Sequence, residues 1–274
     1  MRVAVLILLS AMALVAADAH FDGARVHYES YGSGPKAVVF IHGWTCDLTF
    51  WRGQAPIYEK YRSLLIDLPG HGESDKPPVS YTMDYFARAV DAVLRDAGVE
   101  HAVLLGHSMG VPVAMAFLHL FPGKAKAMVF VDGYLRWDAP KNSDAIATLD
   151  TPNYKTWMSG VVDSMFSSNT SPALRQEIKS KMLATPRQVV FSAWEGMRSA
   201  ASLARDATFS IPALAILRGG RVNTAYKKRL RSVFPDLRGY ETWQGSGHFL
   251  MMESPARFNQ SLAAFLDSIG FSAP

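Results

Sequence analysis

A serine flanked by glycines is the most chemically suggestive pattern in the sequence. Residues 106–110 read Gly-His-Ser-Met-Gly, and they lie between a short apolar run at 103–105 and a helix-like segment at 113–120. A serine on such a strand-to-helix turn has an exposed hydroxyl, and the glycines two residues away remove Cβ clashes. The N–H groups that begin the following helix stabilise negative charge nearby. Ser108 is therefore a candidate nucleophile; the alternative is a tight turn in which Ser108 only caps the helix.

Short apolar runs rich in β-branched residues alternate with segments of helical period along the chain. Each run fits a buried strand. The runs cover residues 36–41, 63–66, 101–105, 127–131 and 213–217. Helical segments are expected at residues 82–97, 223–234 and 256–269. This alternation predicts an α/β fold, with a mostly parallel sheet covered by helices on both faces.

Four motifs together resemble those of the α/β-hydrolase family, and they occur in the family's order. They are FIHGW at 40–44, DLPGHGES at 67–74, GHSMG at 106–110 and GSGH at 245–248. The resemblance covers nearly all of the chain after the first twenty residues. It implies Ser108 as nucleophile, His248 as general base, and the backbone N–H groups of Trp44 and Met109 as an oxyanion hole. Relatives that open epoxides or remove halides carry Asp as nucleophile, so a serine favours acyl transfer.

His248 is preferred among the eight histidines because of its place in the chain. It lies in a glycine-flanked turn late in the sequence, after a strand-like segment at 240–243. This matches the family order of serine, acid and histidine. His42, His71 and His107 stand beside motif glycines instead, and we expect them to orient loops through hydrogen bonds.

The acid of the triad is where the sequence departs from the family pattern. In most relatives it follows the strand at 211–217, but residues 211–235 contain neither Asp nor Glu. A second arrangement in the family places the acid after the preceding strand, where Asp132 follows residues 127–131. The resemblance therefore implies that Asp132 orients the imidazole of His248. Two alternatives stay open: Asp132 is a plain strand-end residue, and Asn223 orients His248 as a neutral acceptor.

Residues 134–210 break the alternation of strands and helices. The segment is richer in Ser, Thr, Asn and Met, and its aromatic residues are spaced as in short helices. We expect an inserted helical cap, with ordinary crossover helices as the alternative. Its apolar side chains suit a large, adaptable pocket for an ester with a hydrophobic acyl or alcohol part. The candidate pocket residues are Trp137, Trp157, Met158 and Trp194, with Met165, Phe166 and Met197 in the same segment.

The first nineteen residues have the pattern of a secretory signal peptide. Met1-Arg2 precedes an apolar run at 3–15, and residues 17–19 have the small-x-small form that signal peptidase accepts. The run is shorter than the about 20 residues that a membrane-spanning helix needs, so an uncleaved anchor is the weaker interpretation. We therefore expect residues 1–19 to be removed and residues 20–274 to form one exported hydrolase domain, periplasmic or secreted.

Composition narrows the class of protein. The chain of 274 residues is 49% hydrophobic, which excludes a disordered protein. A formal charge of +4 from scattered basic residues gives no dense patch for nucleic acid. Cys46 is the single cysteine, and we expect a small buried side chain rather than a reactive thiol. The sequence has no metal-ligand spacing or nucleotide-binding loop, so we expect neither a metal nor another cofactor.

These features together predict a serine hydrolase that cleaves small-molecule carboxylic esters through an acyl-enzyme intermediate. Alternatives on the same triad are acyl transfer to peroxide or another acceptor, and cleavage of a carbon–carbon bond in a β-diketone-like substrate. A non-catalytic binding protein on the same fold is a further alternative, in which the missing acid after residue 217 reflects lost catalysis. We expect no nucleic acid partner and no stable membrane span, and the sequence leaves the oligomeric state open.

Overall fold

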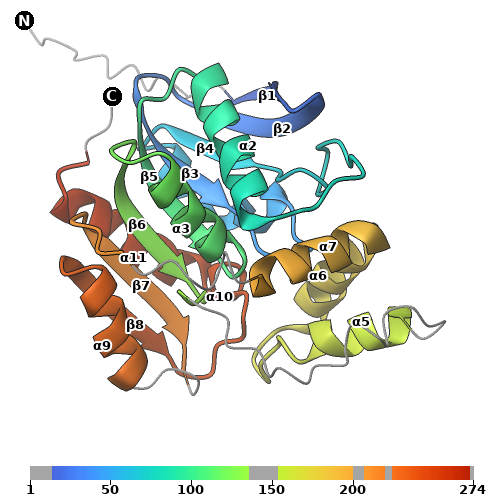
Figure 1. Cartoon of the computed structure of the whole chain (residues 1–274). Coiled ribbons are helices and arrows are strands. Elements are labelled where there is room, and N and C mark those ends of the chain that lie inside the picture. Colours follow the sequence, from blue (N-terminus) through green and yellow to red (C-terminus); the bar gives the residue numbers. More distant parts are fainter. Residues whose placement is uncertain (1–13, 136–153, 200–206, 220–223, 272–274) are drawn as a thin grey trace, which may run out of the picture.

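An eight-stranded sheet forms the centre of the molecule (Figure 1). The computed structural model describes residues 14–135, 154–199, 207–219 and 224–271. The strands lie in the order β1-β2-β4-β3-β5-β6-β7-β8, in which β1 and β2 are antiparallel to their neighbours and the other strands run parallel. Their bounds are β1 Leu14–Phe21, β2 Ala24–Tyr31, β3 Lys36–Ile41, β4 Ser63–Ile66, β5 His101–His107, β6 Ala125–Val131, β7 Ala213–Arg218 and β8 Leu237–Trp243.

Helices cover both faces of this sheet. In Figure 1, α2 (Met83–Asp96) and α3 (Gly110–Leu120) lie in front of the strands, and α11 (Pro255–Ser268) lies behind them. The Thr82 side chain accepts a hydrogen bond from the Tyr85 N–H and so caps the start of α2. The remaining helices of this part of the chain are η1 Leu48–Gln54, α1 Ala55–Tyr58, α9 Thr224–Val233 and α10 Leu250–Glu253.

The central strands read as continuous apolar runs because both of their faces are covered. All four residues of β4 are buried, as are all but one residue each of β3, β5, β6 and β7. The predicted strands agree with β3 to β8 to within three residues, and α2, α9 and α11 begin and end within one residue of expectation. The predicted α/β-hydrolase fold is therefore confirmed.

Three helices lie between β6 and β7 in the chain: α5 (Tyr154–Asp163), α6 (Pro172–Ala184) and α7 (Arg187–Arg198). We call these helices, together with the loops that join them, the cap. Figure 1 shows them together at one end of the sheet, beyond the carboxyl ends of its parallel strands. The cap is tied to the sheet domain where the Trp44 indole N–H donates to Val190 O at 2.8 Å. Residues 136–153 and 200–206 of the segment expected to form the cap lie outside the described residues.

The amino-terminal strand differs from expectation. Residues 14–19, which we expected outside the fold, lie in β1, where Ala19 is fully buried. The Asp18 carboxylate accepts hydrogen bonds from Arg25 and His27, both at 3.0 Å. Leu14 and Val15 are instead 53% and 55% exposed. Residues 1–13 lie outside the described residues, so cleavage after Ala19 stays a prediction, and it would remove six of the eight residues of β1.

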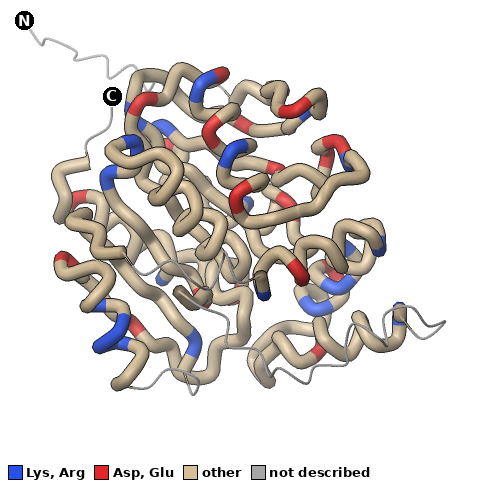
Figure 2. The backbone as a smooth tube through the Cα atoms, viewed as in Figure 1, with Lys and Arg blue, Asp and Glu red and all other residues tan. Residues whose placement is uncertain are grey.

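Charged residues of both signs are spread over the molecule (Figure 2). One grouping of basic side chains is on α9, which carries Lys227, Lys228, Arg229 and Arg231. Among the helices of the described ranges, none is both long and apolar enough to cross a lipid bilayer.

Candidate active site

Ser108 lies on the sharp turn that joins β5 to α3. Its φ of 51° is in the left-handed region, which is strained for a residue with a side chain. Only glycine fits two residues before it and two residues after it. A Cβ on Gly106 would lie 2.5 Å from Gly110 O, and a Cβ on Gly110 would lie 2.3 Å from Ile41 O. The two glycines therefore let the turn close against β3 and present Ser108 to the cavity described below.

Two backbone N–H groups beside this serine are available to a ligand. The N–H groups of Trp44 and Met109 donate to no other group within the described ranges, and both residues line the cavity. His42 holds the loop that carries Trp44, because its Nδ1 donates to Gly43 O at 2.8 Å and its Nε2 accepts from the Leu68 N–H at 3.0 Å. The role of the two N–H groups as an oxyanion hole stays a prediction.

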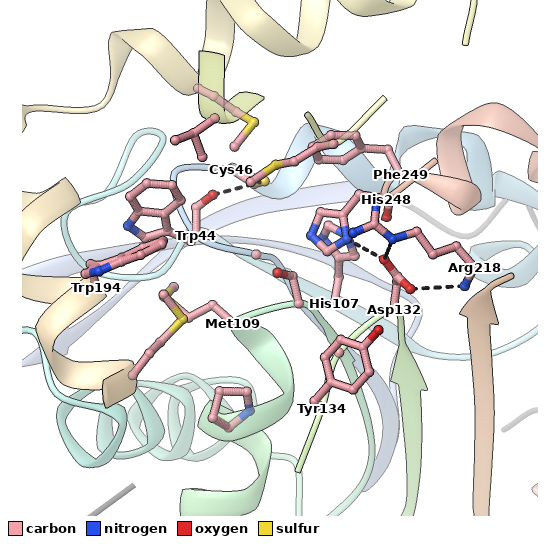
Figure 3. A pocket seen from close by; sticks show the side chains of 18 of the residues that line it. Trp44, Cys46, His107, Met109, Asp132, Tyr134, Trp194, Arg218, His248 and Phe249 are labelled. Carbon is pink, nitrogen blue, oxygen red and sulfur yellow. Dashed lines mark hydrogen bonds and ion pairs between the residues drawn. The ribbon is translucent and has the colours of Figure 1, made fainter. Parts of the chain in front are cut away.

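Asp132 and His248 are brought together although they lie 116 residues apart in the sequence (Figure 3). Asp132 directly follows β6, and its Oδ2 lies 2.5 Å from Nδ1 of His248. The carboxylate of Asp132 is also bonded to β7, because its Oδ1 accepts a hydrogen bond from the backbone N–H of Arg218 at 3.0 Å. Burial alone would raise the pKa of Asp132, but the bond to His248 and the charge of Arg218 hold that pKa below its usual value. Asp132 is therefore a carboxylate at neutral pH.

The backbone at Asp132 is unusual for a strand end. Its φ of 40° is in the left-handed region, and its N–H donates to Ile216 O of β7 at 2.9 Å. This turn aims the side chain at His248 and into the cavity rather than along the sheet. Strained residues persist where the surrounding structure determines them, and they gather at functional sites. Asn223, the alternative partner for His248, lies outside the described residues.

His248 sits on a loop after β8 that is bonded to the cap. Its N–H donates to Met165 O at 2.8 Å, and the amide of Asn169 donates to Gly245 O at 3.0 Å. Glu253 links this loop to the cap. Its carboxylate accepts hydrogen bonds from the Gly247 N–H at 2.7 Å and from the Thr170 hydroxyl at 2.5 Å. The cap and the loop thus form one hydrogen-bonded unit.

The Ser108 hydroxyl makes no hydrogen bond to the imidazole of His248 in this structure, although both residues line one cavity. Such bonds are often long before substrate binds, so this geometry is compatible with proton transfer between the two groups.

The other motif histidines act on loops, as expected. The His107 ring lies 4.7 Å from the ring of His248, and its Nε2 donates to His248 O at 3.0 Å. His71 donates from Nδ1 to Pro69 O at 3.1 Å. Burial lowers the pKa of His71 and of His107 to about 3, so both rings are neutral at pH 7.

The cavity beside Ser108 has an apolar end and a polar end (Figure 3). Its volume is about 240 Å³. In Figure 3, Trp44 and Trp194 lie on one side, while Asp132, Arg218 and His248 lie on the other. The apolar lining includes Trp44, Met109, Met165, Met182, Trp194, Met197 and Phe249. This space can accept an apolar group next to a reacting carbonyl.

Of the four candidate pocket residues, one lines the cavity, two do not, and one lies outside the described residues. Trp194 lines the cavity. Met158 is fully buried within the cap and does not reach the cavity, and Trp157 borders a separate open hollow while packing edge-on against Trp194 at 6.2 Å. Trp137 lies outside the described residues. Val161 and Met165 line the cavity in place of Trp157 and Met158. The helical spacing of the segment does not reveal which face of α5 turns toward the cavity.

Sequence analysis also missed cavity residues outside the cap. Phe249 directly follows His248, and Arg218 is the last residue of β7. Cys46 is buried, as expected, and it lines the cavity as well. Burial raises the pKa of its thiol, so it is a poor nucleophile there.

Within the described ranges, no group of three His, Cys, Asp or Glu side chains is placed to hold a metal ion.

Comparisons with known proteins agree with this architecture. An uncharacterized protein of Mycobacterium tuberculosis is 33% identical over 141 residues, which cover 47% of this chain and 41% of the relative. The chain thus spans about two fifths of the length of the first curated relatives that it matches.

Two solved structures show the same fold over almost the whole chain. A bromoperoxidase from Bacillus anthracis superposes with a TM-score of 0.80 at 20% identity, covering 92% of this chain and 100% of the other. A thermophilic esterase from Thermogutta terrifontis superposes with a TM-score of 0.79 at 22% identity, covering 93% and 99%. The family model for the alpha/beta hydrolase fold matches residues 36–215, more than half of the sequence. The chain therefore belongs to the alpha/beta hydrolase family.

Proposed function

We propose that this protein is a serine hydrolase that cleaves carboxylic esters through an acyl-enzyme intermediate. The observation that carries the proposal is the buried 2.5 Å contact between Asp132 and His248, which face the same cavity as Ser108. A nucleophile, a base and a group that orients the base are the parts that such a reaction needs. The two unpaired N–H groups of Trp44 and Met109 add a site for the negative charge of the intermediate.

In the proposed reaction, Ser108 Oγ attacks the ester carbonyl carbon while Nε2 of His248 accepts the hydroxyl proton. The carbonyl oxygen becomes negative and accepts hydrogen bonds from the N–H groups of Trp44 and Met109. The intermediate then collapses, the carbon–oxygen bond to the alcohol breaks, and His248 returns the proton to the leaving oxygen. Water, activated by the same base, attacks the acyl-enzyme and releases the acid, which restores the Ser108 hydroxyl.

The cavity supports a hydrophobic acyl or alcohol part in the substrate. Sulfur-containing and aromatic side chains form its apolar end, and methionine adapts readily to ligands of different shape. The volume of about 240 Å³ favours a small-molecule ester over a polymer. A preference for acetyl esters over longer or aromatic ones would count against this substrate class.

A chain-length series of p-nitrophenyl esters tests the proposed activity, with Ser108→Ala beside it. Ser164→Ala is a matched control, because Ser164 also lines the cavity but its hydroxyl donates to Val161 O. We expect Ser108→Ala to lose at least about 10³-fold in kcat, and Ser164→Ala to stay within about threefold of the parent. If the parent hydrolyses no ester and a fluorophosphonate fails to label Ser108, a non-catalytic binding protein replaces the proposal.

Acyl transfer to peroxide is the second candidate activity, and the likeness to a structure described as a bromoperoxidase motivates it. It would use the same acyl-enzyme, with peroxide in place of water in the second step. Adding hydrogen peroxide to the ester assay and measuring peracid distinguishes the two. Peracid formed faster than free acid, with peroxide far less concentrated than the solvent water, would favour transfer over hydrolysis.

We also propose that the protein is exported. The support is the signal-like pattern of residues 1–19, together with the exposure of Leu14 and Val15 at the outer end of β1. Mass spectrometry of the protein recovered from the periplasm or medium would test this. A chain beginning at His20 is the expected product, and a chain that retains residues 1–13 would contradict cleavage.

A further inference from the structure

The carboxylate of Asp132 faces the cationic side chain of Arg218 as well as the ring of His248. Nε of Arg218 lies 3.2 Å from Oδ2 of Asp132, the same oxygen that contacts Nδ1 of His248. The backbone N–H of Arg218 also donates to Oδ1 of Asp132 at 3.0 Å. The Arg218 side chain is only 13% exposed and lines the cavity. One acid is thus shared between a histidine and an arginine (Figure 3).

Strand pairing places Arg218 against Asp132. Arg218 is the last residue of β7, and β7 pairs with β6 so that Val131 lies opposite Ile216. Asp132 directly follows Val131, so it lies beside the end of β7. The end of β7 therefore presents a positive charge to the Asp132 carboxylate.

The other groups around His248 do not supply this charge. His107 on β5 is neutral because burial lowers its pKa, and Tyr134, after β6, carries an uncharged phenol at neutral pH. Glu253 on α10 is negative, and its carboxylate is bonded to the Gly247 N–H and the Thr170 hydroxyl. Among the cavity-lining residues that the structure describes, Arg218 is the one lysine or arginine.

We propose that Arg218 is a positioning residue that fixes the Asp132 carboxylate and limits how strongly Asp132 stabilises protonated His248. The inference rests on the proposed role of His248 as the base. A carboxylate at 2.5 Å favours the imidazolium, which cannot accept the proton of Ser108. The guanidinium opposes this by direct repulsion and by sharing the carboxylate. Arg218 therefore extends activity toward lower pH.

The test measures the rate at which a fluorophosphonate labels Ser108 between pH 4 and 9. Labelling needs the unprotonated base, so its acid limb reports the protonation of His248 without a known substrate. Arg218→Gln removes the charge, and we expect it to move this limb upward by about one pH unit. Arg218→Lys keeps the charge and should leave the limb within about 0.3 units of the parent. Arg238→Gln, at an exposed arginine of β8, is the control and should not move it.

A purely structural role for Arg218 gives a different result. In that case Arg218→Gln lowers the labelling rate at every pH and leaves the acid limb in place, which overturns the inference. An upward shift in Arg218→Lys equal to that in Arg218→Gln overturns it as well. Arg218→Met retains the apolar stem and replaces the Gln variant if that variant fails to fold by circular dichroism. Failure of the parent itself to be labelled would refute the proposed function rather than the role of Arg218.

Discussion

Replacing Asp132 by Asn is the sharpest test of the acid, because the surrounding bonds dictate how the new amide must lie. Oδ1 of Asp132 accepts from the Arg218 N–H, so the amide oxygen of an asparagine has to occupy that position. The amide NH₂ then takes the place of Oδ2 and faces Nδ1 of His248 and Nε of Arg218. Both the ring orientation and the charge balance change, with almost no change in volume.

The expected loss follows from two effects. The charge-assisted bond to His248 is removed, which costs about 1.5–3 kcal/mol, or roughly 10- to 150-fold. In addition, an NH₂ group that donates to Nδ1 forces the ring proton onto Nε2, so that His248 can no longer accept the proton of Ser108. A comparable Asp-to-Asn change in a serine protease triad lowers kcat by about 10⁴. We therefore expect Asp132→Asn to lose about 10³- to 10⁴-fold in kcat.

The assay compares ester turnover and fluorophosphonate labelling of Asp132→Asn with those of Asp91→Asn. Asp91 is a matched control, since its side chain is also buried and paired with two cations, Arg95 and Lys124. Asp91 does not line the cavity, so its variant should keep parental kcat even where thermal unfolding shows lower stability. Turnover above a tenth of the parental value in a folded Asp132→Asn would refute the reasoning and leave Asp132 as a plain strand-end residue.

Three further perturbations have definite outcomes. A Cβ at Gly43 would lie 2.9 Å from Nδ1 of His107, so Gly43→Ala should displace the oxyanion loop and lower kcat by about tenfold or more, with KM little changed in ester kinetics. Trp194 lines the apolar end of the cavity, so Trp194→Ala should shift the preferred ester toward longer acyl chains in the chain-length series. Burial lowers the pKa of His42 to about 4, and those of His71 and His107 to about 3. As the pH falls, these histidines bind protons in the unfolded chain at a higher pH than in the folded chain. The free energy of unfolding, measured with urea, should therefore fall as the pH drops from about 6.5 toward 4. A free energy that does not fall would contradict the burial of these histidines in the neutral form.

The parts of the fold that the sequence predicted are those with a strong local signal. Strands buried on both faces leave uninterrupted apolar runs, and α2 leaves an apolar face with a threonine cap at Thr82. The turn at Ser108 was found because its glycines are sterically required, as the contacts of Gly106 and Gly110 show. The residues that carry these signals stand within a few positions of one another in the sequence, so one sequence is enough to find them.

The amino-terminal hairpin was missed although it carries a recognisable signal. Asp22 and Gly23 form the two-residue turn between β1 and β2, and both have positive φ, at 51° and 75°. Asp-Gly between two extended segments is a common hairpin signal. It was overlooked because the apolar start of the chain fits a signal peptide, and because β2 mixes buried and half-buried residues instead of forming an apolar run.

The lining of the cavity could not be predicted because it depends on how distant elements meet. Met158 and Met165 belong to the same short stretch and have the same chemistry, yet only Met165 reaches the cavity. Arg218 is an ordinary strand-end arginine in the sequence. Its importance comes from the pairing of β6 with β7, which places it against Asp132.

The bonds between the cap and the loop of His248 have a consequence for how the enzyme can evolve. Met165 O holds the His248 N–H, and Thr170 shares Glu253 with the same loop. A chimera that received the cap of a relative would thus inherit a new support for His248, the proposed base, together with a new pocket. Under the proposed function, substrate range and catalytic rate are therefore not independent traits in this protein. A cap graft that omits the compensating changes at Gly245–Glu253 should bind its new substrate and turn it over poorly.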